Sequence, residues 1–131
     1  MNKSKTPPLP TESEFDILTI LWDHGAATVR QVHEYLSQTK PSQYTTTLKL
    51  MQIMAEKGIV ERDETDRSHV YTPRVDREWV QRQMAANLMN RVFGGSTRSL
   101  LLGALGAKRA SKKELSELRQ LLDEHERENK R

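Results

Sequence analysis

Three segments near the start of the chain carry apolar residues every three or four positions, which is the spacing of one face of an α-helix. Thr11 and Glu14 have the spacing of a capping box before the first segment, and Gly25 follows that segment. Thr28 and Gln31 repeat the capping signal before the second segment. The pattern predicts three helices between residues 11 and 58. Their inward-facing positions are Phe15, Leu18, Leu21 and Trp22, then Val29, Val32, Tyr35 and Leu36, and finally Thr47, Leu50, Met51 and Met54.

The period of the pattern changes after Gly58, which is expected to end the third helix. Residues 59–62 and 68–72 are rich in β-branched and aromatic side chains and predict two short strands. The polar residues between them predict a turn, and Pro73 suits the end of an edge strand because it cannot donate a ladder hydrogen bond. Three helices followed by a hairpin is the order of a winged helix-turn-helix. The expected fold class is therefore mainly α with a small β-hairpin wing and a C-terminal helical region.

Helical spacing returns in the C-terminal part of the chain. Asp76 is a candidate cap for a fourth helix, which Gly94 and Gly95 interrupt, and a short apolar helix is expected over residues 96–105. A third capping box, which starts at Ser111, begins the last helix. The apolar positions of the fourth helix include Trp79, Met84, Leu88 and Val92. The expected organisation is a disordered arm over residues 1–10, a winged-helix DNA-binding domain over 11–75 and a helical dimerisation domain over 76–131.

The last two predicted helices carry more apolar surface than so short a segment can bury by itself. One interpretation is that these leucines fold back onto the N-terminal domain. The favoured interpretation is a homodimer, because a two-fold dimer would bury them and would also match a palindromic DNA site. The candidate dimerisation residues are Leu100, Leu101, Leu102, Leu105, Leu115, Leu118, Leu121 and Leu122.

Composition narrows the function classes. The chain has no cysteine, which excludes disulfides and thiolate metal sites, and none of its four histidines lies three or four residues from another. No catalytic motif is present, so we expect neither an enzyme, nor a metal site, nor a cofactor. No apolar segment suggests a secretory signal or a membrane span, so we expect a cytoplasmic protein without direct membrane insertion. The net charge is +3, but the basic excess lies in residues 76–131, so bulk charge alone does not predict DNA binding.

The third predicted helix carries the most informative chemistry. Pro41 and Ser42 precede it, and Ser42 is its expected N-cap. If Thr47, Leu50 and Met51 face the core, the polar residues of the first turns face away from it. Gln can bind adenine through two hydrogen bonds, Thr can contact a base or a phosphate, and Lys can contact guanine or phosphate. The same residues would also suit an ordinary solvated helix, but their place before a hairpin favours a DNA-recognition helix.

Basic residues outside this helix are weaker candidates for DNA contact. Arg62, Arg67 and His69 lie in the predicted hairpin, where several acidic residues oppose close contact with phosphate, so Arg67 is the stronger candidate there. Arg30, at the start of the second helix, could bind a phosphate or be an ordinary surface charge. The candidate DNA-binding residues are Arg30, Ser42, Gln43, Tyr44, Thr45, Thr46, Lys49, Arg62 and Arg67.

Several segments together resemble the penicillinase-repressor family of BlaI and MecI. The resemblance is carried, in order, by residues 9–32, by Tyr44–Thr47 with Met54–Gly58, by Arg62–Pro73 and by Glu114–Leu118. It implies a winged-helix domain, a helical dimerisation region, and repression by a homodimer at an inverted-repeat operator in double-stranded DNA. Leu48 and Ile53 stand where many relatives carry basic residues, which implies fewer contacts at those positions.

The resemblance also implies how repression is relieved. In this family the repressor can be cleaved in its C-terminal region after a membrane sensor-protease detects a β-lactam. The cleaved bond of the staphylococcal repressors joins Asn and Phe, and its nearest counterpart here is Gly103–Ala104. The copper-sensing cousins use a C-terminal cysteine motif, which this chain lacks. Two alternatives stay open: a winged-helix module that binds protein instead of DNA, and a repressor released by a small-molecule ligand.

Overall fold

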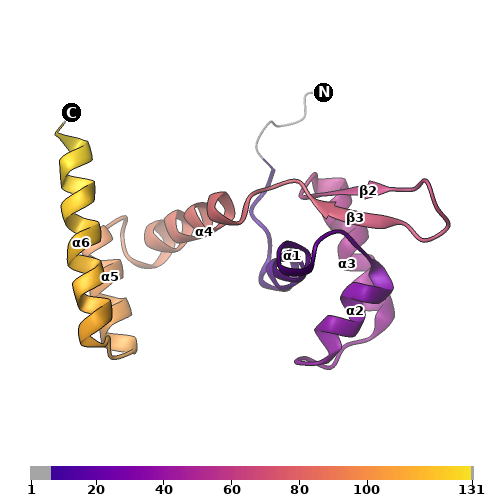
Figure 1. Ribbon diagram of the computed structural model, residues 1–131, viewed down its shortest axis with the longest axis horizontal. Coiled ribbons are helices and arrows are strands. Elements are labelled where there is room, and N and C mark those ends of the chain that lie inside the picture. Colours follow the sequence, from indigo (N-terminus) through magenta and orange to yellow (C-terminus); the bar gives the residue numbers. More distant parts are fainter. Residues whose placement is uncertain (1–6, 131) are drawn as a thin grey trace. The chain divides into compact units, whose positions relative to one another are not determined.

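A computed structural model describes residues 7–130 of the chain (Figure 1). Its elements in chain order are α1 (Glu12–His24), β1 (Ala27–Thr28), α2 (Val29–Ser37), α3 (Tyr44–Lys57), β2 (Val60–Asp63), β3 (Val70–Pro73), α4 (Arg77–Val92), α5 (Thr97–Ala107) and α6 (Lys112–Asn129). Most of the arm predicted for residues 1–10 lies outside the described residues. Pro10, however, is buried, so ordered structure begins before the first helix.

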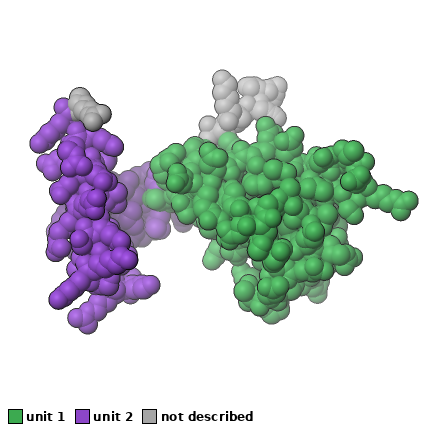
Figure 2. Space-filling view, viewed as in Figure 1, with its two compact units in different colours: residues 1–85 green, residues 86–131 purple. Residues whose placement is uncertain are grey.

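The chain divides into two compact units, residues 1–85 and residues 86–131 (Figure 2). The division falls inside α4, later along the chain than the boundary between residues 75 and 76 that the sequence suggested. The reason is that the start of α4 belongs to the core of the first unit: Val80 is fully buried, and just before the helix the carbonyl of Val75 accepts from the indole Nε1 of Trp22 at 3.0 Å.

The first two helices begin as their capping signals predict. Thr11 Oγ1 accepts from the amide of Glu14 at 3.2 Å, and Glu14 Oε1 accepts from the amide of Thr11 at 3.0 Å. Thr28 and Gln31 form the same reciprocal pair at 3.2 and 2.9 Å. Helix α1 ends at Gly25, whose φ of 89° is rarely adopted by other residues. These predicted signals therefore fix the ends of α1 and the start of α2.

The sheet has three strands where the sequence predicted a two-stranded hairpin. The strand order is β1-β3-β2, and both pairings are antiparallel. Strand β1 has two residues, with Ala27 opposite Tyr71 and Thr28 opposite Val70. A strand this short has no recognisable alternation of its own, and its partner lies far along the chain. The sequence pattern therefore missed it.

The core of the first unit lies between α1, α2, α3 and the sheet, and most predicted inward positions belong to it. Its buried members are Ile17, Leu18, Leu21, Ala27, Val29, Val32, Met51, Met54, Ile59, Val60 and Tyr71. One prediction of an inward side chain was wrong: Tyr35 is 37% exposed and stacks on His24. Of the apolar positions predicted for the fourth helix, Trp79 is partly covered while Leu88 and Val92 are exposed, and the buried side chain of α4 is Val80.

The second unit has almost no core of its own. Gly94 and Gly95, with φ of 59° and 79°, separate α4 from α5, and Ser96 and Ser111 cap α5 and α6 by accepting from the amides of Ser99 and Glu114. No residue of α5 or α6 is fully buried. The exposed leucines of this unit include Leu101, Leu102, Leu105, Leu121 and Leu122.

Candidate nucleic-acid interface

Helix α3 begins one residue later than expected and without a side-chain cap. Gln43 occupies the N-cap position in extended conformation and makes no capping hydrogen bond. The prediction that Ser42 caps this helix was wrong, because the chain turns into the helix after Gln43. The Ser42 Oγ is instead buried and has no partner among the described residues. The first amides of α3 are therefore free of side-chain caps, and such amides favour an anion such as phosphate.

One face of α3 is polar and exposed. Thr47, Met51 and Met54 are fully buried against the other helices and the sheet. The candidate DNA-contact residues of the first turns all lie on the exposed side: Gln43, Tyr44, Thr45, Thr46 and Lys49. The structure thus brings these candidates together in the orientation that the apolar pattern predicted for the helix. Their contacts with DNA remain predictions.

Side chains of α2 hold the start of α3 from the side. His33 Nδ1 lies 3.0 Å from Thr47 Oγ1, and the His33 ring meets the Tyr44 ring edge to face at a centroid distance of 5.6 Å. The Arg30 guanidinium lies over the same Tyr44 ring, 5.5 Å from its centroid. Arg30 is exposed, so it keeps access to a ligand at the start of α3.

Sequence reasoning gave His33 no role beyond its exclusion from a metal site. His33 is partly buried and hydrogen-bonded between two helices. A signal was available, because His33 lies four residues after the buried Val29 and therefore on the inward side of α2. The pattern of apolar residues gives no weight to a histidine at such a position.

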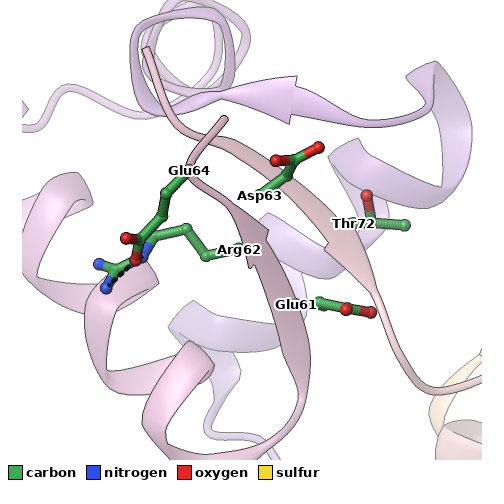
Figure 3. Close-up of a pocket in the computed structure, with 5 residues that line it drawn as sticks. All are labelled: Glu61, Arg62, Asp63, Glu64 and Thr72. Carbon is green, nitrogen blue, oxygen red and sulfur yellow. Dashed lines mark hydrogen bonds and ion pairs between the residues drawn. The ribbon is translucent and has the colours of Figure 1, made fainter. Parts of the chain in front are cut away.

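In the wing, which is formed by β2, β3 and the turn between them, acidic residues lie beside Arg62 (Figure 3). Arg62 projects on one side of β2 and forms an ion pair with Glu64 at 2.6 Å. Glu61 and Asp63 lie on the other side, near Thr72. Because Glu64 neutralises the Arg62 guanidinium, Arg62 attracts a phosphate less strongly than an unpaired arginine would. Arg67, by contrast, is exposed and has no ion-pair partner within residues 7–130.

Local interactions shift the pKa values of two wing residues further from neutrality. The Thr65 hydroxyl and, after it, the Thr65 amide donate to Asp63, which lowers the pKa of that carboxyl. Hydrogen bonding to Tyr71, and then the nearby Glu64 carboxylate, raise the pKa of the Arg62 guanidinium. The wing carries charges of both signs, with acidic groups at its tip.

Other classes of site find no support in residues 7–130. No group of three histidine, aspartate or glutamate side chains is placed so that it could hold a metal ion. None of the helices in this part of the chain has both the length and the apolar character needed to cross a membrane.

Comparison with known proteins decides the family. The model of the penicillinase repressor family matches residues 10–124. The chain belongs to the penicillinase repressor family. A family of transcriptional repressors is not a family of enzymes, so the expectation of a non-enzyme is confirmed by membership.

Two relatives of known name match most of the chain, and a third matches less than half of it. The penicillinase repressor of Bacillus licheniformis is 26% identical over 126 residues, which are 96% of this chain and 98% of that protein. The methicillin resistance regulatory protein MecI of Staphylococcus aureus is 23% identical over 113 residues, 86% of this chain and 92% of its own length. The transcriptional regulator BlaI of Mycobacterium tuberculosis is 40% identical over 58 residues, 44% of this chain and 42% of its own.

A solved structure supports the fold. The solution structure of the DNA-binding domain of the repressor BlaI matches with a TM-score of 0.51 and 24% sequence identity, and covers 56% of this chain and 90% of that one. The prediction of a winged helix is thereby confirmed, with the addition of the short strand β1.

Proposed function

We propose that this member of the penicillinase repressor family is a cytoplasmic repressor that binds an inverted-repeat operator as a homodimer. The observation that carries the proposal is the polar face at the start of α3, exposed while Thr47 and Met51 on the opposite side are buried. An α-helix presented in this way fits the major groove of B-DNA. The solved relative is itself the DNA-binding domain of a repressor.

Each candidate residue of α3 has a definite role in this proposal. Gln43 and Thr45 or Thr46 contact base edges, since an amide can bind adenine and a threonine methyl can contact thymine. Lys49, one turn further on, binds a phosphate or a guanine. The free amides at the start of α3, together with the exposed Tyr44, bind the phosphate backbone, whereas the buried hydroxyl of Ser42 does not take part.

The remaining cations make the weaker part of the interface. In this proposal the exposed Arg30 and Arg67 neutralise phosphates of the DNA backbone. Arg62 contributes less, because Glu64 already holds its guanidinium. The acidic wing is the observation that favours the second candidate, a module that binds protein through α3.

The homodimer rests on the second unit. Its leucine side chains lie largely exposed in the single chain, and neither α5 nor α6 has a fully buried residue. Association of two such units would remove this apolar surface from water, at about 25 cal/mol for each Å² buried. A two-fold dimer would also present two α3 helices to the two halves of an inverted repeat.

Operator binding is expected to be selective and strongly dependent on salt. Selection from a random DNA pool should yield an inverted repeat, and its affinity should fall about 1,000-fold between about 50 and 200 mM salt, because phosphate contacts release counterions. Lys49→Ala should flatten the slope of log affinity against log salt by about one for each subunit, whereas Lys113→Ala on α6 should not. Gel shifts at several salt concentrations measure both effects. Equal affinity for selected and random DNA favours the protein-binding module instead.

We propose that repression is relieved by proteolysis in the second unit, linked to β-lactam sensing by a membrane sensor-protease. The support is that the relatives are a penicillinase repressor and a methicillin resistance regulatory protein. Gly103 and Ala104 lie inside α5, and a Cβ at Gly103 would come within 3.0 Å of the Phe93 ring. Proteases cleave exposed flexible segments more readily than helices, so α5 must first unwind locally.

Exposure of the native cells to a β-lactam is therefore expected to produce a fragment of the repressor that ends at Gly103. Mass spectrometry of the protein recovered before and after exposure measures the fragment. Recovery of the intact chain while its operator becomes free would contradict cleavage and favour release by a small-molecule ligand.

A further inference from the structure

We propose that His33 is a positioning residue for DNA recognition: it fixes the first turn of α3 from the neighbouring helix and does not itself touch DNA. The inference rests on the proposed function, since it concerns how the exposed face of α3 is aimed. It assigns a role to a side chain of α2 that no apolar or basic pattern singles out.

The contacts of His33 reach two residues of α3. Its Nδ1 lies 3.0 Å from the Thr47 hydroxyl, and its ring packs edge to face against Tyr44, with an interplanar angle of 82°. Its Nε2 lies 3.3 Å from the Ser37 hydroxyl, one turn along α2. The ring is therefore held at one nitrogen by its own helix and at the other by α3.

These contacts from α2 matter because no side chain caps the start of α3. Gln43 makes no side-chain capping bond, and the Ser42 hydroxyl has no partner within the described residues. A missing side-chain cap weakens the first turn of a helix. Tyr44 and Thr47 are three residues apart and lie on one side of the helix, so fixing both also fixes the direction of the residues between them. Those residues are Thr45 and Thr46, which face outward.

The hydrogen bond between His33 and Thr47 is suited to holding the start of α3 in one orientation. Thr47 is fully buried, and a buried hydroxyl that loses its partner is strongly disfavoured. A neutral imidazole has one donor and one acceptor nitrogen, and the hydroxyls of Thr47 and Ser37 can each donate or accept. Either tautomer therefore satisfies both hydroxyls. Leucine fills similar space without any hydrogen bond, whereas asparagine places an amide close to the position of Nδ1.

The experiment compares operator and random DNA for matched variants. The operator is the fragment that the wild-type chain selects from a random pool, and binding is measured at a temperature where circular dichroism shows every variant to be folded. We expect His33→Leu to weaken operator binding about tenfold while binding to random DNA changes less than about twofold. His33→Asn should stay within about threefold of wild type for both DNAs. Thr47→Val, which removes the same bond inside the protein, should resemble His33→Leu, and the double variant should be no worse than either.

The possible results distinguish a failure of the positioning role of His33 from a failure of the proposed DNA-binding function. A parallel loss of operator and random binding in His33→Leu, or additive losses in the double variant, overturns the positioning role alone. If His33→Leu fails to fold, Thr47→Val and His33→Asn decide the question by the same ratio of affinities. A wild-type chain that prefers no fragment over random DNA refutes the proposed function, and this inference with it.

Discussion

The double substitution Leu121→Asp with Leu122→Asp is expected to leave a folded first unit on a monomeric chain that binds the operator at least about 100-fold more weakly. The two leucines are 59% and 58% exposed in the single chain. In a homodimer they would be covered, and burial of each is worth about 1.5–3 kcal/mol. In the double variant a dimer would bring four carboxylates, two from each chain, into the same interface. They would lose their hydration without gaining a partner, which strongly disfavours association.

The effect on DNA follows from the loss of a second binding site. In a dimer, binding of one α3 holds the other near its half-site at high effective concentration, which commonly raises affinity by about 10²–10⁴. A monomer has one half-site only. Light scattering at micromolar concentration measures the mass, and titration of the full operator against a half-site measures the loss.

A matched control lies on the same helix. Ser116 and Gln120 are exposed and lie on the face of α6 opposite the leucines, so Ser116→Asp with Gln120→Asp adds the same charge away from the proposed interface. This variant should remain dimeric and bind as wild type. A wild-type chain of monomeric mass would contradict the homodimer and would favour leucines that fold back on the same chain.

The parts of the fold that could be predicted from sequence are those set by neighbours along the chain. Thr11 with Glu14 and Thr28 with Gln31 form their capping bonds within four residues, so the sequence contains the whole interaction. The inward side of α3 followed from the spacing of Thr47 and Met51 in the same way. The polar face on the other side of α3 could therefore be predicted from the sequence as well.

The missed features depend on partners distant in sequence. Strand β1 exists because Ala27 lies opposite Tyr71 in the sheet, and the role of His33 depends on Thr47 in the next helix. Ser42 is a residue type that commonly caps helices, but α3 begins one residue later, with Gln43 at the N-cap position. Local propensity cannot decide between two adjacent starting points when contacts with another helix fix the first turn.

The ion pair between the buried Glu14 and the partly exposed Lys57 is another contact between distant parts of the chain, 43 residues apart in sequence. Glu14 is 2% exposed in α1, and its carboxylate accepts from Lys57 Nζ at 2.8 and 3.1 Å and from the amide of Thr11. The pair joins the start of α1 to the end of α3, where the positive charge also favours the helix terminus. The helix proposed to contact DNA is thus held at both ends by side chains of other helices.

Lys57→Met is therefore expected to lower the free energy of unfolding by about 2–4 kcal/mol, because it leaves the Glu14 carboxylate buried without its counter-charge. Partial exposure of Lys57, at 30% of its side chain, places the effect toward the lower end. Adding Glu14→Gln should restore much of the loss, since a neutral amide needs no counter-ion. Urea unfolding followed by circular dichroism measures all three chains.

Lys40→Met provides the matched control for this pair. Lys40 and Asp16 form an ion pair at 3.3 Å that is exposed on both sides, and such pairs contribute only about 0–1 kcal/mol. The same chemical change should therefore be nearly neutral there. Equal effects at Lys40 and Lys57, or a double variant with Glu14→Gln that is less stable than Lys57→Met alone, would show that the Glu14 carboxylate does not depend on Lys57. A larger effect at Lys57 that Glu14→Gln relieves would show that Lys57 stabilises the fold by neutralising the buried Glu14 carboxylate. The exposed carboxylate of Asp16 needs no such counter-charge.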